Sequence, residues 1–371
     1  MKIFLDTVGC RLNQAEIEAM AGQFRAAGHE IVATAEGADL AVVNTCAVTS
    51  AAAADSRSAI RRAARAGAGQ VVPTGCWVSL QPQQASELPR VSQLVTNERK
   101  DALVPDLLHL DPQVFDAEPI ARDPLPGAHR RTRLFLKVQD GCDNRCAFCI
   151  TTVARGASRS RSIAAIRRDI QRALSGGAQE IVLTGVHLGA WGRDLGADLK
   201  TLVRAILEGT SVPRLRLSSL EPWDLDEEFF SLWGDPRLCP HLHLPLQSGC
   251  ASTLRRMARK TTPESFRQLV QGARRIIPDV AITTDVIAGF PGETDSEFEE
   301  SLQFVRAMEF AGGHAFTYSA RAGTVAAKRS DQVPTSIRRM RTRRYMDVFA
   351  GSSLRFRHAY VGHTRPVLWE S

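Results

Sequence analysis

Short apolar runs alternate with helix-length segments along most of this 371-residue chain. In the first hundred residues the strand-like runs are 3–5, 30–32, 40–43 and 70–72, with a further one at 91–95. Helical periodicity covers residues 14–27 and 50–66 between them. Strands separated by helices predict a parallel sheet with helices on its faces. We therefore expect residues 1–111 to form an α/β domain.

The same alternation resumes after residues 112–133, a stretch with many prolines and acidic residues that predicts a linker. Six further strands are expected at residues 134–138, 180–183, 214–217, 241–246, 281–287 and 314–318. The helical segments are 162–174, 198–207, 225–233, 263–276, 295–308 and a basic one at 336–357. Six strand–helix units are more than a doubly wound domain needs and fewer than the eight of a closed barrel. Residues 134–358 are therefore predicted to form a partial (β/α)6 barrel, with its chemistry at the carboxyl ends of the strands.

Three cysteines follow the first barrel strand with the spacing C-x3-C-x2-C: Cys142, Cys146 and Cys149. Iron–sulfur clusters are held by cysteine thiolates, and a cubane cluster with three protein ligands leaves its fourth iron open to another ligand. Zinc held by three cysteines and a histidine is the alternative, but no histidine lies in this local loop. The spacing of this loop triad therefore predicts an open iron–sulfur site.

Three more cysteines share a second pattern, which we call the N-terminal triad: Cys10, Cys46 and Cys76. Each lies in the loop between a predicted strand and the next helix. Such loops gather at the carboxyl edge of a parallel sheet, where ligand sites form. Three unrelated buried cysteines are the alternative, but the repeated context of strand, Gly or Thr, then Cys favours convergence on a second site.

The composition is typical of a soluble globular protein, with 44% apolar residues, 23% charged residues and a net charge of +7. No apolar run reaches the roughly 20 residues that span a bilayer, and the amino terminus lacks the layout of a secretion signal. We expect a cytoplasmic protein without a membrane partner. In that reducing compartment, eight cysteines predict metal binding or catalysis rather than disulfides. The excess of arginine favours a polyanionic partner, although genome base composition explains it equally well.

The loop triad, with Phe148 before its last cysteine, resembles the signature of the radical S-adenosylmethionine superfamily. The sequences around the N-terminal triad, at 7–13, 44–49 and 74–76, resemble the N-terminal domain of its methylthiotransferase family. Further similar motifs are 154–156, 159–161, 181–186, 243–249 and 285–294. The resemblance covers about residues 1 to 358. It implies two [4Fe–4S] clusters, one on each triad, and S-adenosylmethionine bound at the loop triad.

The resemblance also implies roles for single residues. Cys142, Cys146 and Cys149 would be catalytic as ligands of the radical-generating cluster, and Cys10, Cys46 and Cys76 would hold the auxiliary cluster. The expected S-adenosylmethionine contacts are Phe148, Gly185, Ser218, Glu221 and Gln247. The arginines expected to contact RNA phosphates are Arg155, Arg159, Arg161, Arg338, Arg339 and Arg343.

Residues 44–49, 55–57 and 185–189 look most like the MtaB branch of the family. That branch methylthiolates C2 of N6-threonylcarbamoyladenosine at position 37 of tRNA, next to the anticodon. The implied partners are the tRNA anticodon stem-loop, a low-potential electron donor of the flavodoxin or ferredoxin type, and a sulfur donor. The alternatives are the MiaB branch, which acts on N6-isopentenyladenosine, and a catalytically impaired iron–sulfur RNA-binding relative. Residues 359–371 are expected to begin a TRAM β-barrel domain, truncated to its first strand.

Overall fold

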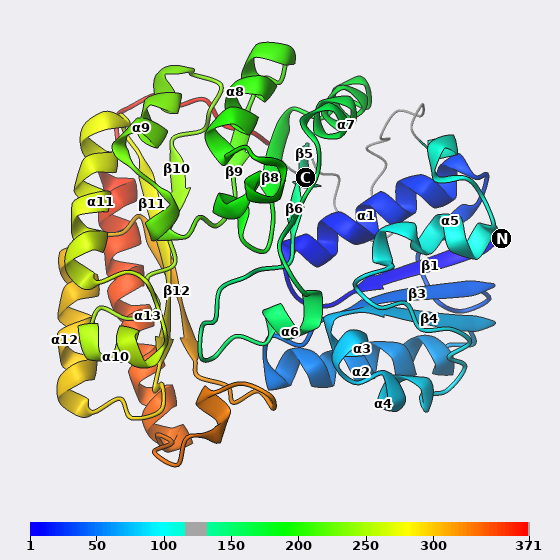
Figure 1. Cartoon of the computed structure of the whole chain (residues 1–371), viewed down its shortest axis with the longest axis horizontal. Coiled ribbons are helices and arrows are strands. Elements are labelled where there is room, and N and C mark those ends of the chain that lie inside the picture. Colours follow the sequence, from blue (N-terminus) through cyan, green and yellow to red (C-terminus); the bar gives the residue numbers. More distant parts are fainter. Residues whose placement is uncertain (116–131, 370–371) are drawn as a thin grey trace.

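The computed structural model describes residues 1–115 and 132–369. Its N-terminal sheet contains β1 (Lys2–Thr7), β2 (Glu30–Val32), β3 (Leu40–Thr45) and β4 (Gln70–Gly75), all parallel in the order β2-β1-β3-β4. Helices α1 (Arg11–Ala26) and α5 (Leu103–Leu108) cover one face. Helices α2 (Ser50–Arg65), α3 (Cys76–Leu80) and α4 (Pro82–Ser86) cover the other (Figure 1). The prediction of a parallel sheet covered by helices is confirmed.

The strand predicted at residues 91–95 is wrong. This segment touches β4 only through isolated bridges, Val71 with Val91 and Thr74 with Val95. Because two separated bridges do not make a continuous hydrogen-bonded ladder, the segment runs along the edge of the sheet as an irregular loop.

All six predicted strands of the second half are present. Strands β5 (Arg133–Lys137), β8 (Glu180–Thr184) and β9 (Leu215–Leu217) form one parallel sheet, and β10 (His241–His243), β11 (Ala281–Ala288) and β12 (Gly312–Thr317) form another. A bridge between Ser219 and His243 joins the two sheets. The result is the predicted α/β fold with an open, partial barrel.

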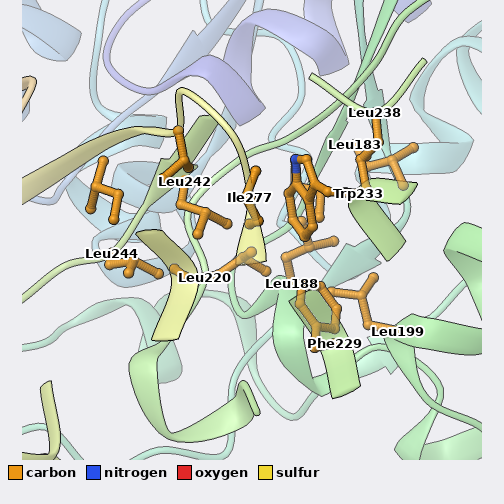
Figure 2. Packing of buried hydrophobic residues seen from close by; sticks show 14 of the residues in the cluster. Leu183, Leu188, Leu199, Leu220, Phe229, Trp233, Leu238, Leu242, Leu244 and Ile277 are labelled. Atoms are coloured by element: carbon orange, nitrogen blue, oxygen red, sulfur yellow. The ribbon is translucent and has the colours of Figure 1, made fainter. Parts of the chain in front are cut away.

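Helices surround this barrel on its outer side (Figure 1). They are α7 (Ile163–Ser175), α8 (Leu199–Gly209), α9 (Glu227–Phe230), α11 (Pro263–Ile276), α12 (Asp295–Ala307) and α13 (Thr335–His358), with the short α10 (Ala251–Arg256) before α11. Figure 2 shows part of the core between strands and helices, where Leu183, Leu242 and Leu244 belong to the same buried cluster as Phe229 and Trp233. Burying each such side chain contributes about 1.5–3 kcal/mol.

The barrel strands alternate between this core and the barrel interior. Leu242 is fully buried in the core, whereas its neighbours His241 and His243 are only partly buried and hydrogen-bond to Thr283 on β11. Successive side chains of a strand point to opposite faces. The interior can therefore hold polar groups while the outer face stabilises the fold.

A small hairpin, which the sequence did not predict, closes the base of the loop triad. Strands β6 (Gln139–Asp140) and β7 (Arg159–Ser160) pair antiparallel, and the short helix α6 (Thr151–Arg155) lies between them in sequence. The segment that carries the three cysteines is therefore held at both ends by backbone hydrogen bonds.

The two remaining predictions concern connecting segments. Of the predicted linker, residues 112–115 form a 3-10 turn and residues 116–131 lie outside the described part of the chain. Residues 359–369 form no strand, so the strand expected there is wrong for these residues, because a single extended segment has no neighbour with which to pair. Within residues 1–115 and 132–369, no helix combines the length and the apolar character needed to cross a membrane.

Candidate active site

The loop triad depends on a tight backbone turn at Gly141. Its φ angle is +71°, and a Cβ atom there would lie 1.9 Å from the carbonyl oxygen of Ala157. The next residue, Cys142, donates its amide to the carbonyl of Gly156 (3.0 Å). Only glycine combines a positive φ with this close approach at little cost, so Gly141 brings the first cysteine against the returning chain.

Gln139, which is fully buried, organises the same turn through its side-chain amide. Its Nε2 donates to the carbonyl of Gly141 (2.7 Å) and to the hydroxyl of Ser158 (2.8 Å). Its Oε1 accepts the backbone amide of His187 (2.8 Å), from the loop after β8. Gln139 therefore fixes the cysteine loop to the neighbouring strand end.

Each sulfur of the loop triad has a nitrogen donor nearby. The amide of Asn144 lies 3.4 Å from Cys142 Sγ, the amide of Thr151 lies 3.4 Å from Cys149 Sγ, and Arg259 Nη1 lies 3.8 Å from Cys146 Sγ. Burial raises the pKa of Cys146, and the positive charge of Arg259 opposes this. Hydrogen bonds to sulfur are part of how proteins tune iron–sulfur clusters, so the donors beside these three sulfurs fit a cluster-binding loop.

His187 lies beside this loop, and sequence reasoning assigned it no functional role. Its Nδ1 is 3.2 Å from Asn144 Nδ2, and its Nε2 is 2.5 Å from Asp224 Oδ2, which also pairs with Arg193 (2.6 Å). Burial lowers the pKa of His187, but its hydrogen bonds to Asp224 and Cys142 outweigh this and raise the pKa to about 9. The signal that the sequence offered was a histidine shortly after the end of a predicted strand.

The predicted S-adenosylmethionine contacts lie after successive strands. Phe148 packs edge-on against Phe290 (6.5 Å between ring centroids) in an apolar cluster beside the loop triad. Gly185 abuts Gln139: a Cβ there would lie 2.7 Å from its Oε1. The hydroxyl of Ser218 is buried without a hydrogen-bond partner in the described residues, which suits a polar ligand.

Two further predicted contacts are constrained within the protein: Glu221 is already paired, and Gln247 has an unusual backbone conformation. Glu221 forms an ion pair with Arg259 (2.6 Å), the same arginine that approaches Cys146, and this arginine stacks over Trp223 at 4.4 Å. Gln247 has a φ of +71°, and its backbone amide bonds to the carbonyl of Asp285 (2.8 Å). Glu221 is therefore linked to the cysteine loop through Arg259.

The N-terminal triad lies at three neighbouring strand ends, as the sequence predicts. Cys10 precedes α1, Cys46 follows β3 and Cys76 begins α3. A Cβ on Gly9 would lie 2.5 Å from Cys46 Sγ, so this thiol packs directly against the residue before Cys10. Burial raises the pKa of Cys46, and the charges of Cys10 and Cys76 raise it further. The three sulfurs therefore share one electrostatic environment.

None of the eight cysteines forms a disulfide. Within the described residues, no three His, Cys, Asp or Glu side chains are arranged to hold a single metal ion. A [4Fe–4S] cluster makes a different demand, because each thiolate binds a separate iron at a corner of the cubane. Free thiols with nitrogen donors beside four of them, Cys76, Cys142, Cys146 and Cys149, fit that demand.

The arginines expected to contact RNA differ in their availability. Arg159, Arg339 and Arg343 are exposed. Arg161 pairs with Asp169 (2.6 Å), and Arg338 bonds to the carbonyl of Tyr318 (3.2 Å). The expectation for Arg155 needs correction: its side chain is only 2% exposed, and its guanidinium pairs with buried carboxylates. A residue so enclosed does not present its charge to RNA.

Comparisons with known proteins agree with this architecture. Residues 2–97 match the family described as "Uncharacterized protein family UPF0004", and residues 136–305 match the "Radical SAM superfamily". The solved radical S-adenosylmethionine methyltransferase TsrM from Kitasatospora setae is similar in fold with a TM-score of 0.64, at 16% identity over 88% of this chain and 77% of its own. The fold and the loop triad thus define a radical S-adenosylmethionine protein with an additional N-terminal α/β domain.

Named relatives identify the family within the radical S-adenosylmethionine superfamily. "Threonylcarbamoyladenosine tRNA methylthiotransferase MtaB" of Thermotoga maritima is 36% identical over 99% of this chain and 86% of its own length, and that of Bacillus subtilis is 36% identical over 91% and 78%. The "tRNA-2-methylthio-N(6)-dimethylallyladenosine synthase" of Cereibacter sphaeroides is 32% identical over 100% and 87%. The chain belongs to the radical S-adenosylmethionine methylthiotransferase family. Membership implies S-adenosylmethionine and a [4Fe–4S] cluster.

Proposed function

We propose that this protein methylthiolates C2 of N6-threonylcarbamoyladenosine at position 37 of tRNA, using two [4Fe–4S] clusters. The observation that carries the proposal is the pair of cysteine triads, each at the carboxyl ends of a parallel sheet and each with three free thiols. The names of the MtaB relatives, at 33–36% identity, support the choice of substrate.

The two triads have separate tasks in this proposal. The cluster on Cys142, Cys146 and Cys149 and its bound S-adenosylmethionine would supply radical chemistry, and the cluster on the N-terminal triad would carry sulfur. The chain itself orients the first site through Gly141 and Gln139. Phe148 excludes water from its apolar side. The partners required are the tRNA anticodon stem-loop, a low-potential electron donor and a sulfur donor.

Two guanidinium groups near Cys46 favour an anionic substituent on the target base. Arg321, from the segment after β12, donates from Nη1 to the Ser50 hydroxyl (3.1 Å), and its Nε is buried without a partner in the described residues. Burial lowers the pKa of Arg321 and the nearby charge of Arg57 lowers it further, whereas the charge of Cys46 opposes this shift. Arg57 lies over the Trp77 ring, 5.8 Å from its centroid.

Neither Arg57 nor Arg321 forms an ion pair within residues 1–115 and 132–369. A carboxylate placed beside them would make charge-assisted hydrogen bonds, whereas an apolar group would leave the two cations uncompensated. The threonylcarbamoyl group carries a carboxylate, and the isopentenyl group of the alternative substrate is apolar. The local charge therefore favours N6-threonylcarbamoyladenosine.

Analysis of tRNA nucleosides by mass spectrometry tests this function. A strain lacking the gene should lose 2-methylthio-N6-threonylcarbamoyladenosine and accumulate its unmethylthiolated precursor. A gene copy carrying Cys142→Ala should fail to restore the modification, whereas Cys239→Ala, which alters a buried cysteine outside both triads, should restore it. Loss of the 2-methylthio-isopentenyl nucleoside instead would overturn the assignment and identify the alternative branch. Unchanged nucleosides of both kinds would favour the impaired relative.

A further inference from the structure

Arg155 connects the two cysteine triads physically. It is the last residue of α6, which follows directly after the loop triad. Its side chain nevertheless points into the N-terminal domain, where Nε lies 3.3 Å from Cys76 Sγ. Asn97, the other donor to this sulfur at 3.6 Å, also bonds to the carbonyl of Ala154 (2.7 Å). The segment after the loop triad is thus joined to an N-terminal cysteine by two separate side chains.

The remaining donors of Arg155 are also fully used. Nη1 lies 3.0 Å from Glu16 Oε1 and 2.9 Å from Asp140 Oδ1, and Nη2 lies 2.9 Å from Asn13 Oδ1. Asn13 and Glu16 belong to α1, the helix that begins after Cys10. Asp140 directly precedes the loop triad. The Arg155 guanidinium therefore holds both ends of the loop triad against the N-terminal domain. It contacts α1, which begins directly after Cys10, and it contacts Cys76, which directly follows β4.

The charges in this buried network do not balance without Cys76. Lys100 pairs with Glu16 at 2.8 Å, and Lys137 lies 3.5 Å from Asp140. With Arg155, these are three cations against two buried carboxylates. The third carboxylate, Asp101, pairs with Lys137 but is 73% exposed, so water screens its charge. A buried excess of positive charge is costly unless it is paired. Cys76, as a ligand of the proposed auxiliary cluster, would supply the missing negative charge next to Arg155.

We propose that Arg155 is a positioning residue for the auxiliary cluster: its Nε–H donates to the Cys76 thiolate and its charge stabilises the reduced cluster. Reduction adds one electron, and hence one negative charge, to the cluster. A donor and a positive charge at a ligand sulfur favour the reduced form and raise the reduction potential. The same contact keeps the two clusters in a defined relative position, because Arg155 is anchored to both ends of the loop triad. This inference rests on the auxiliary-cluster part of the proposed function.

The test is an EPR-monitored redox titration of the full chain in which Cys142, Cys146 and Cys149 are replaced by alanine. Only the auxiliary cluster then remains, and the parent protein should contain about four irons. Adding Arg155→Gln should lower the midpoint potential of this cluster. Asn97→Ala, which removes the longer, uncharged hydrogen bond to Cys76, should lower it less. A loss of stability alone would not lower the midpoint potential more in Arg155→Gln than in Asn97→Ala.

Arg341→Gln is the matched control. Arg341 is also 2% exposed and pairs with a buried carboxylate, Glu293, at 3.0 Å, but it belongs to α13 and its bonds go to Glu293 and Asp295. Its loss should leave the midpoint potential unchanged. If Arg155→Gln cannot retain iron, Arg155→Lys keeps the positive charge while removing the Nε–H, and a lowered potential in that variant supports the role.

Two different failures are distinguishable. A parent protein that binds no iron would overturn the two-cluster function itself. A parent that binds iron, with the same midpoint potential in Arg155→Gln, Arg155→Lys and Arg341→Gln, would overturn only the role of Arg155.

Discussion

Single glycines decide how closely the cysteines of the N-terminal triad approach one another. A side chain on Gly9 would place its Cβ 2.4 Å from Cys46 Cβ, and the φ of Gly9 is +102°. Gly9→Ala should therefore push Cys46 away from Cys10. We expect reconstituted protein to fall from about eight irons per chain to about four, with the loop triad still loaded.

Gly28→Ala is the control for this glycine prediction. Gly28 also has a positive φ, +79°, but a Cβ there would meet nothing within 4 Å. In this variant the backbone strain should lower the free energy of unfolding by on the order of 1 kcal/mol, and the protein should keep all its iron. Equal iron in Gly9→Ala and Gly28→Ala, measured by metal analysis after anaerobic reconstitution, would refute the proposed packing.

In the proposed function, Arg321 recognises the carboxylate of the substrate. Arg321→Gln should lower kcat/KM for an anticodon stem-loop containing N6-threonylcarbamoyladenosine by about 10- to 100-fold, as removal of a hydrogen bond to a charged group does. Arg329→Gln, which alters a half-buried arginine paired with Asp331 at 2.5 Å, is the matched control. Equal kcat/KM in the two variants would remove Arg321 from recognition of the carboxylate.

At the scale of elements, α1 joins the N-terminal domain to the barrel through Glu16. Burial raises the pKa of this carboxyl, but Lys100, Arg155 and Lys137 hold it well below its usual value. Glu16→Gln would leave buried cations unpaired, so we expect the free energy of unfolding to fall by about 3–5 kcal/mol. Urea unfolding of the cluster-free protein measures this. Asp106→Asn, which breaks an exposed pair with Arg99, should change it little; a similar loss in both variants would contradict the network.

Strand β10 contributes a pH dependence through His241. Burial lowers the pKa of His241, and the nearby Arg216, His243 and Arg11 lower it further, to about 3 from an ordinary value of 6.5. The unfolded state therefore binds the proton more readily, so the contribution of neutral His241 is complete above pH 6.5 and is lost as the pH falls towards 3. The associated slope is at most about 1.4 kcal/mol per pH unit.

Replacement of His241 isolates this contribution. His241→Asn should flatten the dependence of unfolding free energy on pH between 6.5 and 3, relative to the unaltered protein. His358→Asn changes an exposed histidine on α13 and should leave the slope as it was. Urea titrations at several pH values provide the measurement, and identical slopes for all three proteins would refute the assignment.

For the whole molecule, the exposed arginines of α13 predict how binding to RNA depends on salt. Arg339 and Arg343 are one helical turn apart and face solvent. Replacing both by glutamine should reduce the slope of log K against log salt concentration by about two, one for each lost phosphate contact. Arg65→Gln, at the far end of α2 from Cys46, is the control and should not change the slope. Fluorescence anisotropy with an anticodon stem-loop measures the slopes; equal values would place the tRNA elsewhere.

Most of the architecture was predictable, because it follows from the periodicity of apolar residues and from the order of strands and helices along the chain. The six barrel strands and the N-terminal parallel sheet follow from alternating apolar runs, and the convergence of Cys10, Cys46 and Cys76 follows from the geometry of parallel strands. The strand at 91–95 was mispredicted, because an apolar run does not reveal whether a neighbouring strand offers it a continuous ladder.

The sequence by itself determined the two cysteine triads and the sheets that carry them, because local spacing and strand order are properties of the chain. Only the tertiary structure decided what surrounds the sulfurs. In the sequence, Arg155 is one of several basic residues after the loop triad. In the folded protein it is buried between Glu16, Asp140 and Cys76. These partners are 139, 15 and 79 positions away in sequence. Pairing of buried charges depends on which distant segments share a low-dielectric interior, and no local pattern records that.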